Sequence, residues 1–95
     1  MINTCYYIVD DKPLSCRIDK SSDNYSLSII TDYDIDYAKL EYTFSADYKD
    51  SNWLKSSANS KLLTTNSFSS SDTIYGQIKY ENSDCSITAD NINYN

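Results

Sequence analysis

The chain has 95 residues, which is enough for one small domain but too short for a core with a deep catalytic cleft. Its formal net charge of −6 opposes a phosphate backbone, so direct binding of nucleic acid is not expected. The chain contains no histidine and a single glycine, which excludes Ser–His and Cys–His nucleophile pairs and glycine-rich phosphate loops. We therefore expect no enzymatic activity and no cofactor.

The composition favours strands over helices. Ser, Thr, Asn, Asp, Ile and Tyr are abundant, whereas the strong helix formers are scarce. Aliphatic residues are few, but ten tyrosines and one tryptophan can supply the missing apolar area. We expect an all-β fold with a core built largely from Tyr and Ile.

The first third of the chain predicts three short strands. A β-prone run at residues 2–9 ends in a turn cluster at 10–13 that contains the single proline. Apolar and polar residues then alternate over 14–19 and, after a polar loop at 20–24, again over 25–29. The side chains expected to face inward are those of Leu14, Cys16, Ile18, Tyr25, Leu27 and Ile29.

The strongest predicted strand follows a connection at residues 31–37 that is rich in Asp and Tyr. It covers residues 38–45, where apolar and polar positions alternate. A polar loop at 46–52 then leads to Trp53, which we expect in the core or at its edge. One face of the strand is expected to carry Ala38, Leu40, Tyr42 and Phe44, and the other Lys39, Glu41, Thr43 and Ser45.

The last third predicts three further strands. A weak strand starts at residues 62–63, a clear one covers 74–80, and a final one covers 85–92. Gly76 lies inside the clear strand, where a glycine often marks a bulge or a close backbone approach. The inward positions of the last two strands are Ile74, Gly76, Ile78, Tyr80, Cys85, Ile87 and Ala89.

Seven to eight short strands at regular spacing indicate a β-sandwich or a small barrel, and we expect one domain over residues 1–95. Met1 leads directly into a polar and aromatic run, so we expect no signal peptide. No apolar stretch approaches the roughly 20 residues that a membrane helix needs. We therefore expect a chain made in a cytoplasm, with no transmembrane segment and no membrane contact.

The three cysteines are too few for a disulfide framework, and their spacing contains no CxxC pair. Cys5 and Cys16 could lie opposite each other if the intervening residues turn a hairpin, and Cys85 follows far along the chain. Reduced, half-buried thiols are the expected state. A zinc site is not expected, because it would need all three thiolates and a carboxylate.

An acidic cluster at Asp32, Asp34 and Asp36 is the most suggestive group of charges. The spacing of two could bring three carboxylates together for a hard cation such as calcium. The surrounding residues do not follow an EF-hand loop, which requires a central glycine and a glutamate at the twelfth position. We expect a solvated loop here and no metal site.

Outward or loop-borne tyrosines are the other candidate contact site. Tyrosine supplies rigid contact area at low entropic cost, which is why binding loops favour it. The residues expected to contact a protein partner are Tyr33, Asp34, Tyr48 and Tyr75. A core role for one of the tyrosines stays open, because the chain has little else to pack.

From Ala38 onward, the order of features resembles immunoglobulin-like and fibronectin type III-like domains. The resemblance rests on Leu40-Glu41-Tyr42-Thr43-Phe44-Ser45, then a polar loop, then Asn52-Trp53-Leu54. Residues 74–80 look like the sixth strand of such domains, and residues 85–88 look like the opening of the seventh. The resemblance implies an immunoglobulin-like β-sandwich of seven to eight short antiparallel strands.

Stand-alone domains of this kind resemble accessory components of tailed-phage virions. The resemblance implies a capsid decoration protein or a head or tail attachment, located in the virion, with capsid or other virion proteins as partners. Edge strands also favour self-pairing, so a homo-oligomer is a further expectation.

Two other functions stay open. A small acidic inhibitor could mimic nucleic acid toward a basic host protein, and it would need its carboxylates gathered on one face. A carbohydrate-binding or adhesive module would need coplanar exposed aromatic rings.

Overall fold

The computed structural model describes residues 14–31, 34–81, 86–88 and 92–94. This part of the chain is all-β, as predicted, with a single short 3₁₀ turn, η1 (Tyr37–Lys39). None of its helical residues forms a segment long and apolar enough to cross a membrane. The strands are β1 (Ser15–Ser21), β2 (Asn24–Ile30), β3 (Leu40–Ala46), β4 (Leu54–Lys55), β5 (Leu62–Ser67), β6 (Ile74–Glu81), β7 (Ser86–Thr88) and β8 (Ile92–Tyr94).

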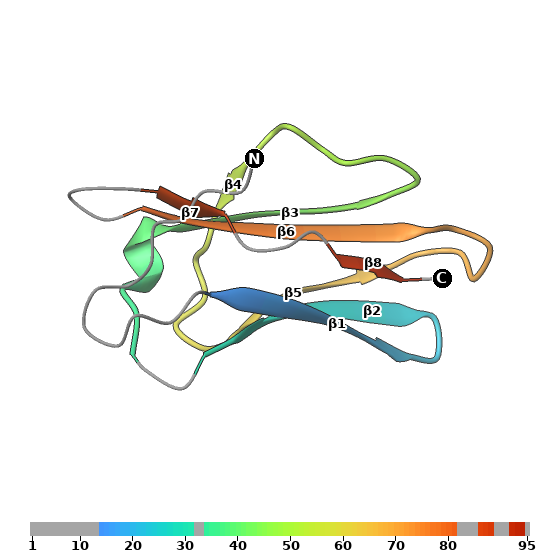
Figure 1. Ribbon diagram of the computed structural model, residues 1–95. Helices are drawn as coiled ribbons and strands as arrows, with labels where there is room; N and C mark the ends of the chain where they lie inside the picture. The colour runs from blue at the N-terminus through green and yellow to red at the C-terminus, as the bar shows by residue number, and fades with distance from the viewer. Residues whose placement is uncertain (1–13, 32–33, 82–85, 89–91, 95) are drawn as a thin grey trace.

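The strands form two antiparallel sheets that pack face to face as a β-sandwich (Figure 1). The first sheet has the order β1-β2-β5, and the second has the order β4-β3-β6-β7, with β8 also paired to β6. The chain starts in the first sheet with β1 and β2 and crosses to the second with β3 and β4. It returns to the first with β5 and ends in the second with β6, β7 and β8. The fold class predicted from the alternating pattern is confirmed. The expected strand at residues 2–9 lies outside the described residues.

The predicted inward faces of the first two strands are confirmed. In the β1–β2 register Cys16 lies opposite Ile29, and Ile18 lies opposite Leu27. An alternating strand can bury one face completely, and here that face meets the second sheet. The buried core of the described residues consists of Leu14, Cys16, Ile18, Tyr25, Leu27, Ile29, Leu40, Ile74, Ile78 and Tyr80.

Gly76 on β6 faces side chains of the first sheet at short range. A Cβ atom at this position would lie 2.8 Å from Leu27 Cδ1 and 3.3 Å from Ile18 Cδ1. The β3–β6 register runs through it without interruption, with Phe44 opposite Gly76. Of the two explanations that a strand glycine allows, the close approach is the one that holds, and no bulge is present at this pairing.

The strand predicted at 38–45 begins at Leu40, so the placement of Ala38 on its inner face was wrong. The Asp36 carboxylate accepts a hydrogen bond from the Ala38 N–H at 3.1 Å and caps η1. An Asp at this position stabilises a helical turn against an extended strand. The buried Tyr80 hydroxyl also accepts from the Asp36 N–H at 3.1 Å, which fixes the entry to β3.

The final strand, predicted as one run over 85–92, is described as two short strands. β7 and β8 both pair with β6, on the edge opposite β3. Thr88 lies opposite Lys79 and Ile92 lies opposite Gly76, so the two pairings are one residue out of register. Cys85 and Ala89, which were assigned to this strand, lie outside the described residues.

Candidate functional site

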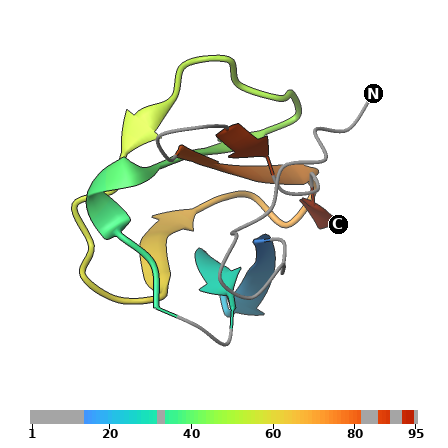
Figure 2. The ribbon, with the colours of Figure 1, turned by 60° about the vertical axis from the view of Figure 1, so that its left-hand side comes forward.

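Residues 46–53 form a loop that leaves β3 and folds back over the outer face of the second sheet (Figure 2). Tyr48 lies on this loop and exposes 60% of its surface. Among the described residues it is the only aromatic side chain that is largely exposed. Exposed aromatic area on a loop is typical of binding surfaces.

Three hydrogen bonds fix the base of this loop. The Asp47 N–H donates to the Thr73 carbonyl at 2.7 Å, and the Thr73 N–H donates to Asp47 Oδ1 at 3.1 Å. The Ser45 hydroxyl donates to the Tyr48 carbonyl at 2.6 Å. Asp47 adopts a φ of 71°, which aspartate tolerates better than most residues. Tyr48 is therefore presented from a backbone whose conformation is already set.

A polar layer lies between the loop and the sheet. Thr43 is 1% exposed and donates its hydroxyl proton to Gln77 Oε1 at 2.9 Å. The Lys79 ammonium lies 5.2 Å from the centre of the Trp53 ring and 4.0 Å from Glu41 Oε1. An ammonium over an indole face is attracted by the ring quadrupole, so the lysine and the tryptophan hold each other in place.

Trp53 does not lie between the sheets. It is half-buried, it packs over Lys79 outside the second sheet, and it is not among the side chains packed on the core. The expectation of a core tryptophan was therefore wrong. Tyr25, Leu27 and the other inward residues already fill the space between the sheets, whereas the outer face offers the aliphatic stem and charge of Lys79.

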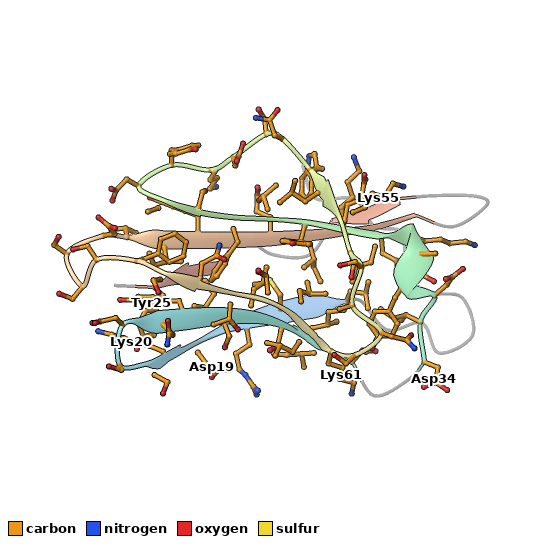
Figure 3. The ribbon with its side chains drawn as sticks, turned by 180° about the vertical axis from the view of Figure 1, so that it is seen from behind. Asp19, Lys20, Tyr25, Asp34, Lys55 and Lys61 are labelled. Atoms are coloured by element: carbon orange, nitrogen blue, oxygen red, sulfur yellow. The ribbon has the colours of Figure 1, made fainter. Side chains whose placement is uncertain are left out.

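Two of the predicted contact residues, Tyr48 and Tyr75, are each next to Ser45, and a third lies elsewhere. Tyr75 on β6 lies directly opposite Ser45, whose hydroxyl binds the backbone of Tyr48. Asp34 is exposed at the other end of the sandwich, next to η1 (Figure 3). Tyr33 lies outside the described residues. Tyr48 and Tyr75 therefore belong to one surface of the sandwich, and Asp34 belongs to another.

In the acidic cluster, Asp36 has a structural role and Asp34 is exposed. Asp32 lies outside the described residues, and the Asp36 carboxylate caps η1. No three His, Cys, Asp or Glu residues of the described ranges come close enough together to hold a metal ion.

Cys16 is buried on β1, and its Sγ lies 4.0 Å from the Gly76 carbonyl oxygen. This contact links β1 of the first sheet to β6 of the second. Cys5 and Cys85, and with them the predicted Cys5–Cys16 pairing, lie outside the described residues.

The residues that fix the loop, Asp47 and Thr73, were not singled out from the sequence. A weak signal was present, because an Asp directly after a strand is a frequent turn residue. Its partner Thr73 lies 26 residues further along the chain, and no local pattern connects the two. No sequence pattern predicted the burial of Thr43 either, because strand alternation only places this residue on the outer face of β3.

Comparisons with protein-family models, curated proteins and solved structures gave no match. A function for this chain is therefore supported by the arrangement of its own residues. That arrangement is one exposed aromatic side chain on a loop that is fixed at its base.

Proposed function

We propose that this chain is a non-enzymatic binding module that docks on a partner protein through Tyr48 and its loop. The observation that carries the proposal is a tyrosine 60% exposed on a backbone held by three hydrogen bonds. Large exposed aromatic side chains are over-represented among the residues that dominate binding energy. A loop fixed before binding loses little conformational freedom when it docks.

An immunoglobulin-like topology is the second part of the proposal. In constant-type immunoglobulin domains the first, second, fourth and fifth strands form one sheet, and the third, sixth and seventh form the other. Here β1, β2 and β5 share one sheet, and β3, β6 and β7 share the other. β4 pairs with β3, which is how variable-type domains extend the sheet of the third strand. This order of strands supports the immunoglobulin-like assignment.

The setting that we propose is a bacteriophage virion, with a capsid or other virion protein as the partner. The resemblance of small stand-alone domains of this kind to phage accessory proteins supports it. A net charge of −6 on each copy would also keep decorated particles apart in solution.

Mimicry of nucleic acid is the weaker candidate, because the described carboxylates are dispersed and occupied. The described residues include nine acidic and seven basic side chains, which are nearly balanced. A mimic would instead need unpaired carboxylates gathered on one face. The carboxylates that accept a hydrogen bond or lie near a cation within the domain are Asp19, Asp36, Glu41, Asp47, Asp50 and Asp72.

A carbohydrate-binding platform is also less well supported. Such a site needs several exposed rings in one plane, whereas Tyr48 is the only largely exposed aromatic side chain of the described residues. Its neighbours Tyr75 and Trp53 are half-buried.

The mass of the native particle tests the virion setting. Tagged protein would be purified in mild salt from the culture that produces it and measured by light scattering. Co-purification with a megadalton shell is expected. Recovery as a monomer, or in a complex with a single basic protein, would overturn this setting and make the inhibitor the leading function.

Substitution of Tyr48 tests the docking surface once that particle is in hand. Tyr48→Ala is expected to weaken binding to the particle by about tenfold or more. Lys49→Ala, in the same loop and also exposed, is the matched control and is expected to change binding by less than about threefold. Equal binding by Tyr48→Ala and the unmodified protein, with both folded, would exclude the loop as the contact.

A further inference from the structure

One edge of β5 presents an extended backbone that no other strand of the described residues pairs. β5 is the last strand of the first sheet, and it crosses the front of the molecule in the view of Figure 3. The Phe68 N–H donates to the Asp23 carbonyl just beyond the β2–β5 ladder. Antiparallel pairs alternate strictly, so the backbone groups of Ser67 and Thr65 point away from β2.

The other sheet edges are short, charged or out of register, whereas the one irregularity of β5 is the register shift at Leu63, outside the regular segment from Thr64 to Ser67. β1 bears the exposed charges of Arg17, Asp19 and Lys20, β4 has two residues, and β7 and β8 have three each and are out of register. Short, charged or interrupted edges are the usual protection against association between sheets. β5 has six residues without a charge or a proline, and it starts at Leu62, which is 49% exposed.

A second copy of this chain fits this edge by charge. Lys61 precedes β5, whereas Asp23 and Asp72 lie at its far end. Two copies paired antiparallel would bring the basic end of each strand to the acidic end of the other. Between these ends the strand is uncharged, so two chains that each carry a net charge of −6 could meet there without opposing like charges.

We propose that two copies of this chain pair antiparallel through β5, with Thr65 of each copy opposite Ser67 of the other. The interface is isologous, because the same two residues supply the outward backbone groups on both sides. The two first sheets then form one continuous sheet across the molecular two-fold axis. This inference does not rest on the docking role of Tyr48, which lies on the loop between β3 and β4 of the other sheet.

Oligomeric state as a function of concentration is the direct test. Light scattering and sedimentation equilibrium are expected to show a reversible rise from 10.9 kDa toward twice that mass. Amide exchange followed by NMR on the same samples is expected to show that the Thr65 and Ser67 amides gain protection as the dimer forms. A protein that stays monomeric at high micromolar concentration would overturn the proposal, as would a dimer in which neither amide gains protection.

A pair of matched double variants locates the interface. Thr65→Lys with Ser67→Lys places lysines directly opposite each other across the proposed junction and is expected to raise the dimer dissociation constant by about tenfold or more. Ser26→Lys with Asn24→Lys places the same charges on the same face, one strand further in, because Ser26 and Asn24 are the pairing partners of those residues. This control also loses the Ser67–Asn24 side-chain hydrogen bond, as the test variant does.

The control variant is expected to keep the dissociation constant within about threefold of the unmodified protein. Equal weakening by both pairs would show that added charge alone is responsible and would overturn the assignment to β5. A monomeric protein whose binding to a different partner is lost only in the Thr65→Lys, Ser67→Lys variant would also overturn self-pairing, and it would assign the edge to that partner.

Discussion

The outer faces of the two sheets are built from similar residues and have opposite environments. On the first sheet, Ser26 and Thr65 lie opposite each other on the outer face, where Ser26 is half-buried and Thr65 is exposed. On the second sheet, Thr43 and Ser45 lie on the corresponding outer side of β3, yet they are 1% and 7% exposed. The loop after β3 folds over the outer face of the second sheet (Figure 2), and the Ser45 hydroxyl is bonded to it through the Tyr48 carbonyl. Strand alternation assigns a side chain to a face, but it does not determine whether that face reaches solvent.

Each covered hydroxyl has a hydrogen-bond partner, as burial requires. Thr43 donates to Gln77, and Ser45 donates to the Tyr48 carbonyl. Tyr25 in the core differs, since its buried hydroxyl has no partner among the described residues. Thr43 and Ser45 are therefore satisfied, whereas two other buried hydroxyls of the described residues, those of Tyr25 and Ser56, have no partner.

The largest expected effect comes from placing a charge on each face. Thr43→Asp would bury a carboxylate beneath the loop and is expected to lower the free energy of unfolding by about 3 kcal/mol or more. Ser26→Asp, on the outer face of the first sheet, is expected to change the free energy of unfolding by no more than about 0.5 kcal/mol. Urea unfolding of the two variants compares them directly. Similar losses would contradict the difference in burial between the faces.

The next effect concerns the attachment of the loop. Asp47→Ala removes the acceptor of the Thr73 N–H and puts alanine at a φ of 71°, so a loss of about 1–2 kcal/mol is expected. Asp47→Gly restores the backbone freedom but not the acceptor, and it is expected to lose less. Thermal unfolding measures both. An equal loss in the two variants would assign the whole effect to the hydrogen bond and none to the backbone conformation.

The third comparison removes one buried hydroxyl that has a hydrogen-bond partner, on Thr43, and one that has none, on Tyr25. Thr43→Val leaves Gln77 without this donor and is expected to cost about 1 kcal/mol. Tyr25→Phe removes a buried hydroxyl that has no partner and is expected to leave stability unchanged or raise it by up to about 1 kcal/mol. Chemical denaturation with a constant m value is the measurement. Destabilisation by Tyr25→Phe as large as that by Thr43→Val would show that the tyrosine hydroxyl has a partner.

The smallest effect compares one cation on each outer face. Lys79→Ala removes the contact with Trp53 and is expected to cost about 0.5–1 kcal/mol. Arg17→Ala removes an ion pair to Asp19 whose side chains are 61% and 53% exposed, and a loss below about 0.5 kcal/mol is expected. High salt should reduce the second loss more than the first. The reverse ranking would show that the loop does not shield Lys79.

Much of the fold follows from the residues themselves. The alternation at Cys16 and Ile18, at Tyr25 and Leu27, and at Ile74 and Ile78 determined which face of each strand meets the other sheet, because successive side chains of a strand point to opposite faces. The exposed position of Tyr48 also follows from the polar loop that carries it.

The tertiary structure alone decided the rest, since it depends on residues that are distant in the chain. Gly76 is favoured because a Cβ atom there would lie 2.8 Å from Leu27 Cδ1 and 3.3 Å from Ile18 Cδ1 of the other sheet, so these side chains would have to shift. The base of the loop is fixed because Asp47 bonds to Thr73, which lies 26 residues further along the chain, and because the Ser45 hydroxyl donates to the Tyr48 carbonyl. Local periodicity sets the face of a residue, but the neighbour that covers the face comes from another part of the chain.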